Sequence, residues 1–440
     1  MRQWAHTILS SAIAKPDQAD FVQKLAEAAR DSGGLDVFNV QTDARQPGLL
    51  EVAVKARRTG RRALFVLNAD PAQPGKLAMA DLVPMQDPAL YAGWPKAAVS
   101  RAEMHRLIHR ALDRLVRTGD FSGCITVFDG KQTVFDECRG LAERNFKVPV
   151  DDQTRFHIGS VDKMFTAVAI AQLVEAGKLS WGATLAQLVP EYPDHAVAKQ
   201  VSVWQLLHHT AGLGDFLVPE YFQHRERFVD QAGYLDLIAR QPKVGEPGKQ
   251  WSYSNAGYVL LGRIIEKVSG ENYFDYIQRH VFAPAGMTDS GFDTIEDVTP
   301  KLSVGYFRDG VFSSDWKADW TKIPFKGGPA GGGYSTNADL LRFAMALHEG
   351  KLVKPATLAK MFDGEVPAGP GGYAAGFGDR VSHRRHIRGH AGGIEGTDVN
   401  LQMVWETGAA VALTSNEGPG QSWLLAEHIA DLLAAGAGEP

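Results

Sequence analysis

The segment Met164–Val174 constrains the fold more than any other part of the chain, because at helical spacing it is apolar on nearly every side. A helix of this kind has no face suited to water, so it must lie inside a core formed by other elements. It is shorter than the roughly 20 apolar residues that cross a bilayer, and no run in the sequence approaches that length. We therefore expect a globular protein with a buried central helix and no membrane span.

Composition narrows the class of protein. Of the 440 residues, 44% are hydrophobic and 22% are charged, which is typical of folded globular proteins and excludes a disordered or fibrous chain. The formal net charge of −5 is too small, and has the wrong sign, for a chain whose main partner is nucleic acid or an anionic membrane. We expect a small-molecule or peptide substrate and no nucleic-acid partner.

Residues 1–86 have the pattern of a small α+β module. A helix is expected over Gln18–Arg30, with one apolar face and a Ser-Gly-Gly stop after it. The expected strands are Leu35–Val40, Leu49–Ala56, Ala63–Leu67 and Lys76–Val83. Residues 87–100 carry prolines and a glycine but no sustained period, so we interpret them as a linker.

Residues 101–440 are predicted to form a second, larger domain that begins with an amphipathic helix. Its strand patterns lie near the two ends, at Gly123–Phe128, Gln132–Glu137, Thr397–Val404 and Ala409–Ser415. The patterns between them are mostly helical. This order predicts an α/β (α+β) fold, in which both chain ends build one antiparallel sheet flanked by helices, with an inserted, mostly helical subdomain.

Two cysteines, Cys124 and Cys138, are too few for a disulfide-built scaffold or a Cys-based zinc cluster. A two-residue turn at Asp129–Gly130 would put Cys124 opposite Phe135 and point Cys138 to the other face of the hairpin. We therefore expect two free thiols.

A serine and a lysine lie at the start of the apolar helix, in Ser160-Val161-Asp162-Lys163. Positions three apart on a helix face the same way, so the Lys163 amine can reach the Ser160 hydroxyl, and the helix N-terminus favours negative charge there. A serine hydroxyl attacks a carbonyl only when its proton is taken. The pair indicates an activated nucleophile, although S-x-x-K alone is also met as a helix cap beside a solvated lysine.

Two further motifs make the pattern specific. Tyr253-Ser254-Asn255 and then His390-Ala391-Gly392-Gly393 follow in order along the chain. Together with the serine and lysine they resemble the serine β-lactamase and penicillin-binding-protein superfamily, and within it the class C-like group of β-lactamases, D-aminopeptidases, DD-peptidases and family VIII esterases. Other matching segments are Leu206–Leu213, Val259–Gly262 and Gly331–Leu340.

The resemblance implies a serine hydrolase that forms an acyl-enzyme at Ser160, with Lys163 and Tyr253 as the proton acceptors. Tyrosine is protonated at neutral pH at its usual pKa of about 10, so Tyr253 could act as a base only if a cation such as Lys163 lowered that pKa. The oxyanion hole would be formed by the backbone N–H groups of Ser160 and Gly393. The implied substrate-binding residues are Asn255, His390 and Gly392. No cofactor and no metal are implied.

The third motif departs from the β-lactamase pattern. Class C β-lactamases usually have K-T-G or K-S-G, whereas this chain has His390-Ala391-Gly392. A histidine is largely neutral at pH 7, and the hydroxyl is absent, so we expect weak capture of a substrate carboxylate and weak or no β-lactamase activity. The basic stretch His383–Arg388 could restore charge near the cleft, but we interpret it as an exposed strand edge.

The predicted substrates are therefore carboxylic esters, or amides and peptides that contain D-amino acids. The alternative from another class is a non-catalytic ligand-sensing or assembly protein that keeps the fold, since one scaffold hosts many functions. The glycine-rich stretch Gly327–Gly333 lacks the Lys-Ser/Thr of a phosphate loop and reads as a flexible loop near the site.

Residues 1–86 resemble, by pattern only, the cystatin- or NTF2-like modules that precede serine-hydrolase domains in some bacterial proteins. Three roles of this module stay open: dimerisation, shaping of the cleft and binding of a ligand. A homo-oligomeric state of the whole protein also stays open. We expect a bacterial periplasmic or secreted location, with no signal peptide visible in this sequence, and the cytoplasm stays an alternative.

Overall fold

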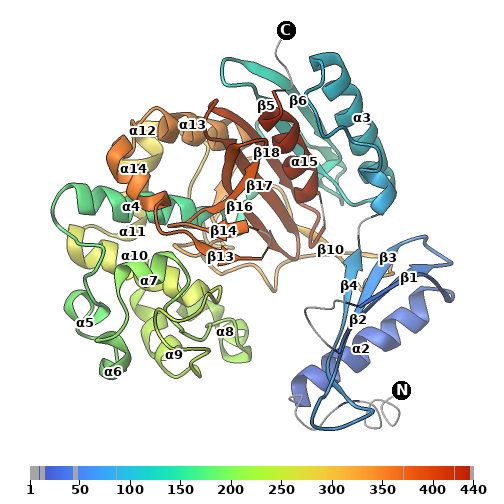
Figure 1. Cartoon of the computed structure of the whole chain (residues 1–440), viewed down its shortest axis with the longest axis horizontal. Coiled ribbons are helices and arrows are strands. Elements are labelled where there is room, and N and C mark those ends of the chain that lie inside the picture. The colour runs from blue at the N-terminus through green and yellow to red at the C-terminus, as the bar shows by residue number, and fades with distance from the viewer. Residues whose placement is uncertain are drawn as a thin grey trace. The chain divides into compact units, whose positions relative to one another are not determined.

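The computed structural model describes residues 9, 15–42, 48–85, 87–369, 371–420 and 422–436. The chain forms two compact units (Figure 1). The first comprises Met1–Gly93 and Tyr306–Ala318, and the second comprises Trp94–Gly305 and Asp319–Pro440. The second unit thus begins within the predicted linker, residues 87–100, but one internal segment, Tyr306–Ala318, belongs to the first unit.

The first unit contains one long helix, α2 (Lys15–Asp31), and a four-stranded antiparallel sheet in the order β1-β2-β3-β4. The strands are β1 (Leu35–Thr42), β2 (Leu49–Ala56), β3 (Arg62–Ala69) and β4 (Leu77–Met85). The helix packs on the apolar face of the sheet, where residues such as Ala28, Val54 and Ala63 are buried together. The helix and all four strands lie where the hydrophobic pattern predicts them.

A hairpin from the middle of the chain completes this unit. It consists of β10 (Tyr306–Arg308) and β11 (Trp316–Ala318), and its Phe312 is fully buried in the same apolar cluster. The Nε atom of Arg61 also donates a hydrogen bond to the carbonyl of Val311 at 3.1 Å. This segment falls within residues 101–440, which are predicted to form one domain, because nothing in its local pattern indicates that its core partners lie more than 200 residues away.

The second unit is built on an eight-stranded antiparallel sheet in the order β13-β14-β15-β16-β17-β18-β5-β6 (Figure 1). The strands are β5 (Gly123–Phe128), β6 (Thr133–Arg139), β13 (Val366–Ala368), β14 (Gly371–Tyr373), β15 (Gly378–Ser382), β16 (Arg385–Ile394), β17 (Thr397–Val404) and β18 (Ala409–Ser415). Because β18 pairs with β5, the two ends of this unit join in one sheet, as predicted.

Helices cover both faces of the large sheet. In Figure 1, α3 (Arg101–Thr118) and α15 (Trp423–Ala434) lie on one side, and α4 (Asp162–Glu175) and α13 (Asn337–His348) lie on the other. The remaining helices belong mostly to the inserted subdomain: α5 (Leu185–Leu188), α6 (His195–Ala198), α7 (Val203–Leu207), α8 (Pro219–Gln223), α9 (Leu235–Ala239), α10 (Asn255–Ser269), α11 (Tyr273–Ile277), α12 (Ala283–Ala285) and α14 (Pro355–Phe362). Within the described ranges, no helix combines the length and apolar character needed to cross a bilayer.

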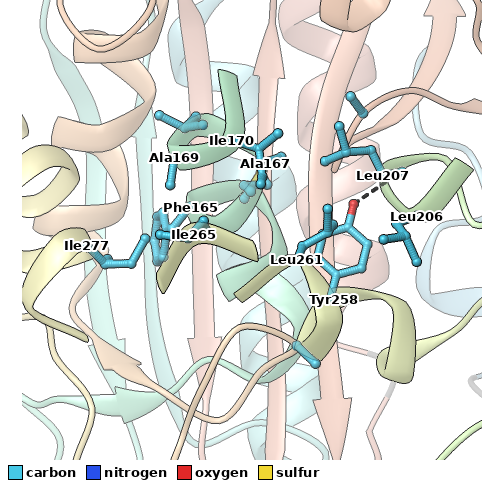
Figure 2. Close-up of a cluster of buried hydrophobic side chains, with 14 of the residues drawn as sticks. Phe165, Ala167, Ala169, Ile170, Leu206, Leu207, Tyr258, Leu261, Ile265 and Ile277 are labelled. Carbon is cyan, nitrogen blue, oxygen red and sulfur yellow. Dashed lines mark hydrogen bonds between the residues drawn. The ribbon is translucent and has the colours of Figure 1, made fainter. Parts of the chain in front are cut away.

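Helix α4 is the central buried helix that the sequence predicts. Its side chains from Asp162 to Ala171 are all buried. The ring of Phe165 packs edge-on against Phe282 and Phe343, and α10 lies alongside (Figure 2). The hydroxyl of Tyr258 donates to the Leu207 carbonyl at 2.9 Å, which ties α10 to the end of α7. The start of α4 is therefore held from several sides.

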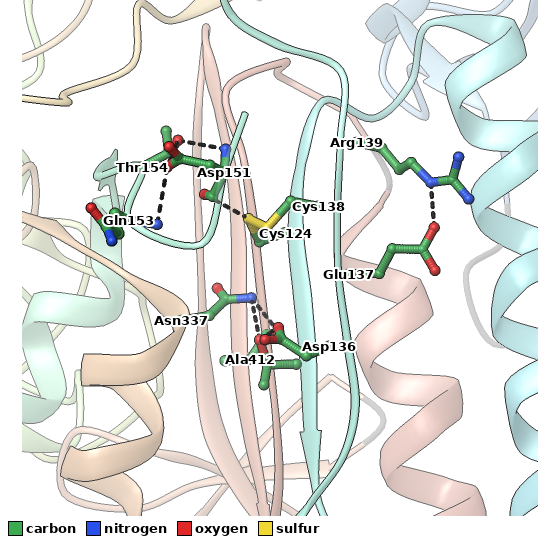
Figure 3. Close-up of a disulfide and its surroundings, with 11 residues drawn as sticks. Cys124, Asp136, Glu137, Cys138, Arg139, Asp151, Gln153, Thr154, Asn337 and Ala412 are labelled. Atoms are coloured by element: carbon green, nitrogen blue, oxygen red, sulfur yellow. Dashed lines mark hydrogen bonds and ion pairs between the residues drawn. A yellow bond between two sulfur atoms is a disulfide. The ribbon is translucent and has the colours of Figure 1, made fainter. Parts of the chain in front are cut away.

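Cys124 and Cys138 form a disulfide between β5 and β6, so the expectation of free thiols is wrong (Figure 3). The connection is a four-residue loop and not a two-residue turn, since Phe128 pairs with Thr133. A β-bulge next to this pair shifts the register once more. The residue opposite Cys124 is therefore Cys138 and not Phe135.

Candidate active site

Ser160 and Lys163 meet at the start of the central helix. Ser160 lies in a short 3₁₀ turn, Gly159–Val161, directly before α4 begins at Asp162, so it precedes the helix instead of occupying its first turn. Lys163 is fully buried, and its Nζ atom lies 3.0 Å from the Ser160 Oγ. The spacing of the motif thus brings the amine and the hydroxyl into direct contact.

The amine of Lys163 has two further acceptors, the Asn255 Oδ1 atom at 2.8 Å and the Ala330 carbonyl. Burial lowers the pKa of Lys163 to about 7, although the negative charges of Asp215 and Asp162 oppose the shift. A neutral amine has two N–H groups and one lone pair. If the Asn255 and Ala330 oxygens take the two N–H groups, the lone pair is left to accept the proton of Ser160.

Tyr253 stands beside the same serine. Its hydroxyl interacts with the Ser160 side chain, the residue as a whole is 37% exposed, and its ring centroid lies 4.8 Å from the Lys163 Nζ. Burial raises the pKa of the phenol above its usual value and outweighs the opposing effect of the hydrogen bond with Ser160. The lowered pKa that Tyr253 would need to act as a base is therefore not found. The geometry favours Lys163 as the base and Tyr253 as a protonated hydroxyl.

His209 orients the segment that carries Tyr253, a role that the sequence analysis does not assign. Its Nδ1 accepts a hydrogen bond from the Ser254 N–H at 3.1 Å, and its carbonyl accepts one from Ser252. The His209 ring lies 4.4 Å, centroid to centroid, from the Tyr253 ring. Burial, with a smaller effect of Lys163, holds the pKa of His209 well below its usual value, so the ring is neutral.

Asn255 is the first residue of α10, and the hydroxyl of the preceding Ser254 caps that helix by accepting from the Gly257 N–H. The Asn255 oxygen faces Lys163, and its Nδ2 donates to the Oδ2 atom of Asp215 at 3.0 Å. Asp215 lies in the loop after α7 and carries no recognisable motif, so the sequence analysis does not identify it as a site residue.

The stretch Gly327–Gly333, predicted to be a flexible loop, is bound firmly to the start of α4. The hydrogen bonds that hold it are Lys163 Nζ to Ala330 O, Thr166 Oγ1 to Pro329 O, Gly333 N to Asp162 Oδ2, Ile158 N to Gly333 O, and Gly332 N to Gly159 O. Because these partners lie far from the loop in sequence, the local pattern does not reveal that the loop supplies a hydrogen-bond acceptor, the Ala330 carbonyl, to Lys163.

Strand β16 runs directly beside Ser160. A Cβ atom at Gly392 would lie only 2.0 Å from the Ile158 carbonyl oxygen, so no other residue fits without movement. The Gly393 nitrogen lies 3.2 Å from the position that a Cβ at Gly159 would take. The structure therefore brings the predicted oxyanion residues side by side and gives Gly392 a close-packing role.

His390 is bonded at both ring nitrogens. Its Nδ1 lies 2.6 Å from the Ala391 carbonyl and its Nε2 lies 3.0 Å from the Tyr373 hydroxyl. A carbonyl only accepts, so Nδ1 carries the proton and Nε2 accepts from Tyr373. Burial, with a smaller effect of Lys163, lowers the pKa of His390 to about 3, so the motif presents no positive charge at neutral pH.

The basic stretch upstream is engaged away from Ser160. Arg388 is 8% exposed, donates to Asp379 at 2.7 Å and stacks on the ring of Phe362, while Arg385 donates to carbonyls at the end of α15. Strands β15 and β16 are interior strands of the sheet. The interpretation as an exposed edge is therefore wrong for Arg388, and this arginine does not supply charge to His390.

The sheet with its helical insertion and the Ser-Lys-Tyr cluster define a β-lactamase/transpeptidase fold. The chain matches the Beta-lactamase family over residues 108–435 and belongs to that family. It is 32% identical over 218 residues to penicillin-binding protein 4 of Amycolatopsis lactamdurans, covering 48% of this chain and 55% of that protein. The chain spans 55–62% of the length of the first curated relatives it matches.

Two other relatives are enzymes by name. The chain is 26% identical over 297 residues to esterase EstB of Burkholderia gladioli, covering 60% of this chain and 74% of that one. The crystal structure of D-amino acid amidase from Ochrobactrum anthropi SV3 superimposes with a TM-score of 0.63 at 26% identity, covering 76% of this chain and 98% of that one.

Proposed function

We propose that this protein is a serine hydrolase that works through an acyl-enzyme at Ser160. The observation that carries the proposal is the 3.0 Å contact between the Lys163 Nζ and the Ser160 Oγ, made by a buried lysine whose pKa is lowered to about 7. A neutral amine at this position takes the serine proton as Oγ bonds to the substrate carbonyl carbon. The backbone N–H groups of Ser160 and Gly393 hold the resulting oxyanion.

Collapse of the tetrahedral intermediate breaks the bond to the leaving alcohol or amine. The proton held by Lys163 passes to that leaving group through the Tyr253 hydroxyl, which contacts Ser160. Water then attacks the acyl carbon and gives a proton to Lys163, which passes that proton to the Ser160 Oγ atom as the bond between Oγ and the acyl carbon breaks. The cycle needs no group other than these side chains, the backbone donors and water.

The proposed substrates are esters or amides without a carboxylate close to the scissile bond. Class C β-lactamases place a lysine where this chain has His390, and here that histidine is neutral and bonded at both nitrogens. The likeness to an esterase and to a D-amino acid amidase supports both bond types. β-Lactams, which carry a carboxylate, should acylate the enzyme slowly.

The decisive experiment is covalent labelling. A fluorophosphonate should add one probe mass to the intact protein, and Ser160→Ala should abolish both labelling and hydrolysis of a p-nitrophenyl ester without changing the melting temperature. Lack of labelling in the folded wild-type protein, or ester turnover in Ser160→Ala within about tenfold of wild type, would contradict the proposal.

We also propose a periplasmic or secreted location. The Cys124–Cys138 disulfide supports it, because structural disulfides persist in oxidising compartments and are rare in the cytosol. Fractionation of the native host tests this proposal, since recovery in the cytosol with both thiols alkylated would contradict it. A homo-oligomer stays a prediction, which light scattering would check.

A further inference from the structure

Asp215 holds the Asn255 amide in one orientation. Its Oδ2 atom accepts two hydrogen bonds from Asn255, one from the backbone N–H at 2.8 Å and one from Nδ2 at 3.0 Å. A carboxylate only accepts, so the nitrogen end of the amide must face Asp215. The oxygen end then faces Lys163, where it accepts from the amine at 2.8 Å.

This orientation matters for the lysine. Turning the Asn255 amide by half a rotation would set its N–H groups against those of Lys163 and would leave Asp215 facing an oxygen. Both contacts would be repulsive, so Asp215 rules the turned amide out. Asp215 is itself fixed, because its Oδ1 atom accepts from the Leu217 N–H at 3.3 Å.

Asp215 also acts on Lys163 through its charge. Two carboxylates raise the pKa of Lys163 and so oppose the effect of burial. Asp215 has the larger effect on this pKa and Asp162 the smaller. Burial raises the pKa of Asp162 to about 8, which weakens the negative charge that this carboxyl offers to the lysine at neutral pH. The other titratable groups around the lysine are neutral there: Tyr253, Tyr258, His209 and His390.

We propose that Asp215 is a positioning residue for the reaction, which fixes the Asn255 oxygen against Lys163 and sets the pH range in which Lys163 accepts the Ser160 proton. The inference rests on the proposed function and deepens it. Asp215 does not touch the substrate in this scheme and acts only through Asn255 and Lys163.

The test uses two variants that separate geometry from charge. Asp215→Asn removes the charge and one acceptor, so kcat/KM for a neutral p-nitrophenyl ester should fall about tenfold to a hundredfold through misplacement of the site. The midpoint of the acidic limb should move down by roughly half a pH unit or more, because the lysine loses a charge that stabilises its ammonium form. Asp215→Glu keeps the charge but not the distance, so the rate should fall while the midpoint stays.

Asp230→Asn is the matched control. Asp230 is a carboxylate of the same subdomain that accepts one backbone N–H, from Gly233, and it is not connected with Lys163. Its replacement should leave both the rate and the midpoint unchanged. Melting curves accompany every variant, and if Asp215→Asn does not fold, Asp215→Glu carries the test through its loss of rate.

The outcomes separate this inference from the proposed function. If fluorophosphonate labels the wild-type protein and Asp215→Asn keeps both the wild-type rate and the wild-type midpoint, the inference is overturned and the proposed function stands. A loss of rate that only follows a loss of folded protein, with an unmoved midpoint, also overturns it. If the wild-type protein is not labelled, both proposals fail together.

Discussion

The Tyr373 hydroxyl lies 3.0 Å from the Nε2 atom of His390 and closes off the one ring nitrogen that could otherwise reach a substrate. The histidine is therefore part of the wall of the site and offers no cation. A residue that resembles the β-lactamase lysine by position thus differs from it in chemistry, and this difference sets the expected substrate preference.

A double substitution, His390→Lys with Ala391→Thr, should raise acylation by a carboxylate-bearing cephalosporin relative to a neutral ester. The change adds a cation and a hydroxyl, and because hydrogen bonds to charged groups contribute about 1.5–3 kcal/mol, the ratio should rise tenfold or more. Stopped-flow acylation measures it on folded protein. His386→Lys, which adds a cation further along the same strand beside Asp379, is the control, and an equal rise there would refute the role of position 390.

Activity should depend on pH through Lys163. The amine is neutral above its pKa of about 7, so kcat/KM should reach a plateau above that value and fall tenfold per unit as the pH drops below it. Lys163→Arg, which stays charged, should lower the plateau value of kcat/KM by about 10²–10⁴-fold. Lys178→Arg, at an exposed lysine beyond the end of α4, should have no effect. A flat profile from pH 5 to 9 would exclude Lys163 as the base.

Replacing both cysteines, Cys124→Ser with Cys138→Ser, should lower the free energy of unfolding by about 3 kcal/mol, because the disulfide closes a short loop of the unfolded chain. Ester hydrolysis at 25 °C should persist, since the bond ties β5 to β6 at the far edge of the sheet from β16. Denaturant melts with and without dithiothreitol check this. The reductant should destabilise the wild-type protein alone, and equal sensitivity of the variant would show that the bond does not stabilise the fold.

Phe312→Ala should destabilise the first unit by about 3–5 kcal/mol, the usual cost of removing a buried phenylalanine. The melting temperature of the second unit should not change. Differential scanning calorimetry measures the two transitions separately. Phe146→Ala, at a residue that is 87% exposed, should shift neither transition. A drop of the second transition alone in Phe312→Ala would contradict the assignment of the hairpin to the first unit.

The sequence predicts those features that depend on residues close together in the chain. Strands β17 and β18 lie at the predicted residues, and both are buried along their whole length. The Ser160–Lys163 contact follows from spacing along one turn. Helix α4 follows from its apolar surface, which only a central position can bury.

Sequence reasoning fails where residues distant in the chain decide the outcome. Asp215 bonds Asn255 and the Ala330 carbonyl bonds Lys163 from separate loops, and no pattern near either residue indicates this. The disulfide depends on a loop length and a β-bulge that together move the register of one hairpin. The membership of Phe312 in the first unit depends on a core completed from the middle of the chain.

The hairpin at Tyr306–Ala318 also orders events during synthesis. Domains usually fold as their residues leave the ribosome, N-terminal units first. Here the N-terminal sheet is translated early, whereas Phe312, which packs in its core, emerges only after Ser160 and most of the helical subdomain. The unit that is made first is thus completed late, and a nascent chain halted before residue 312 would lack one buried ring of that unit's core.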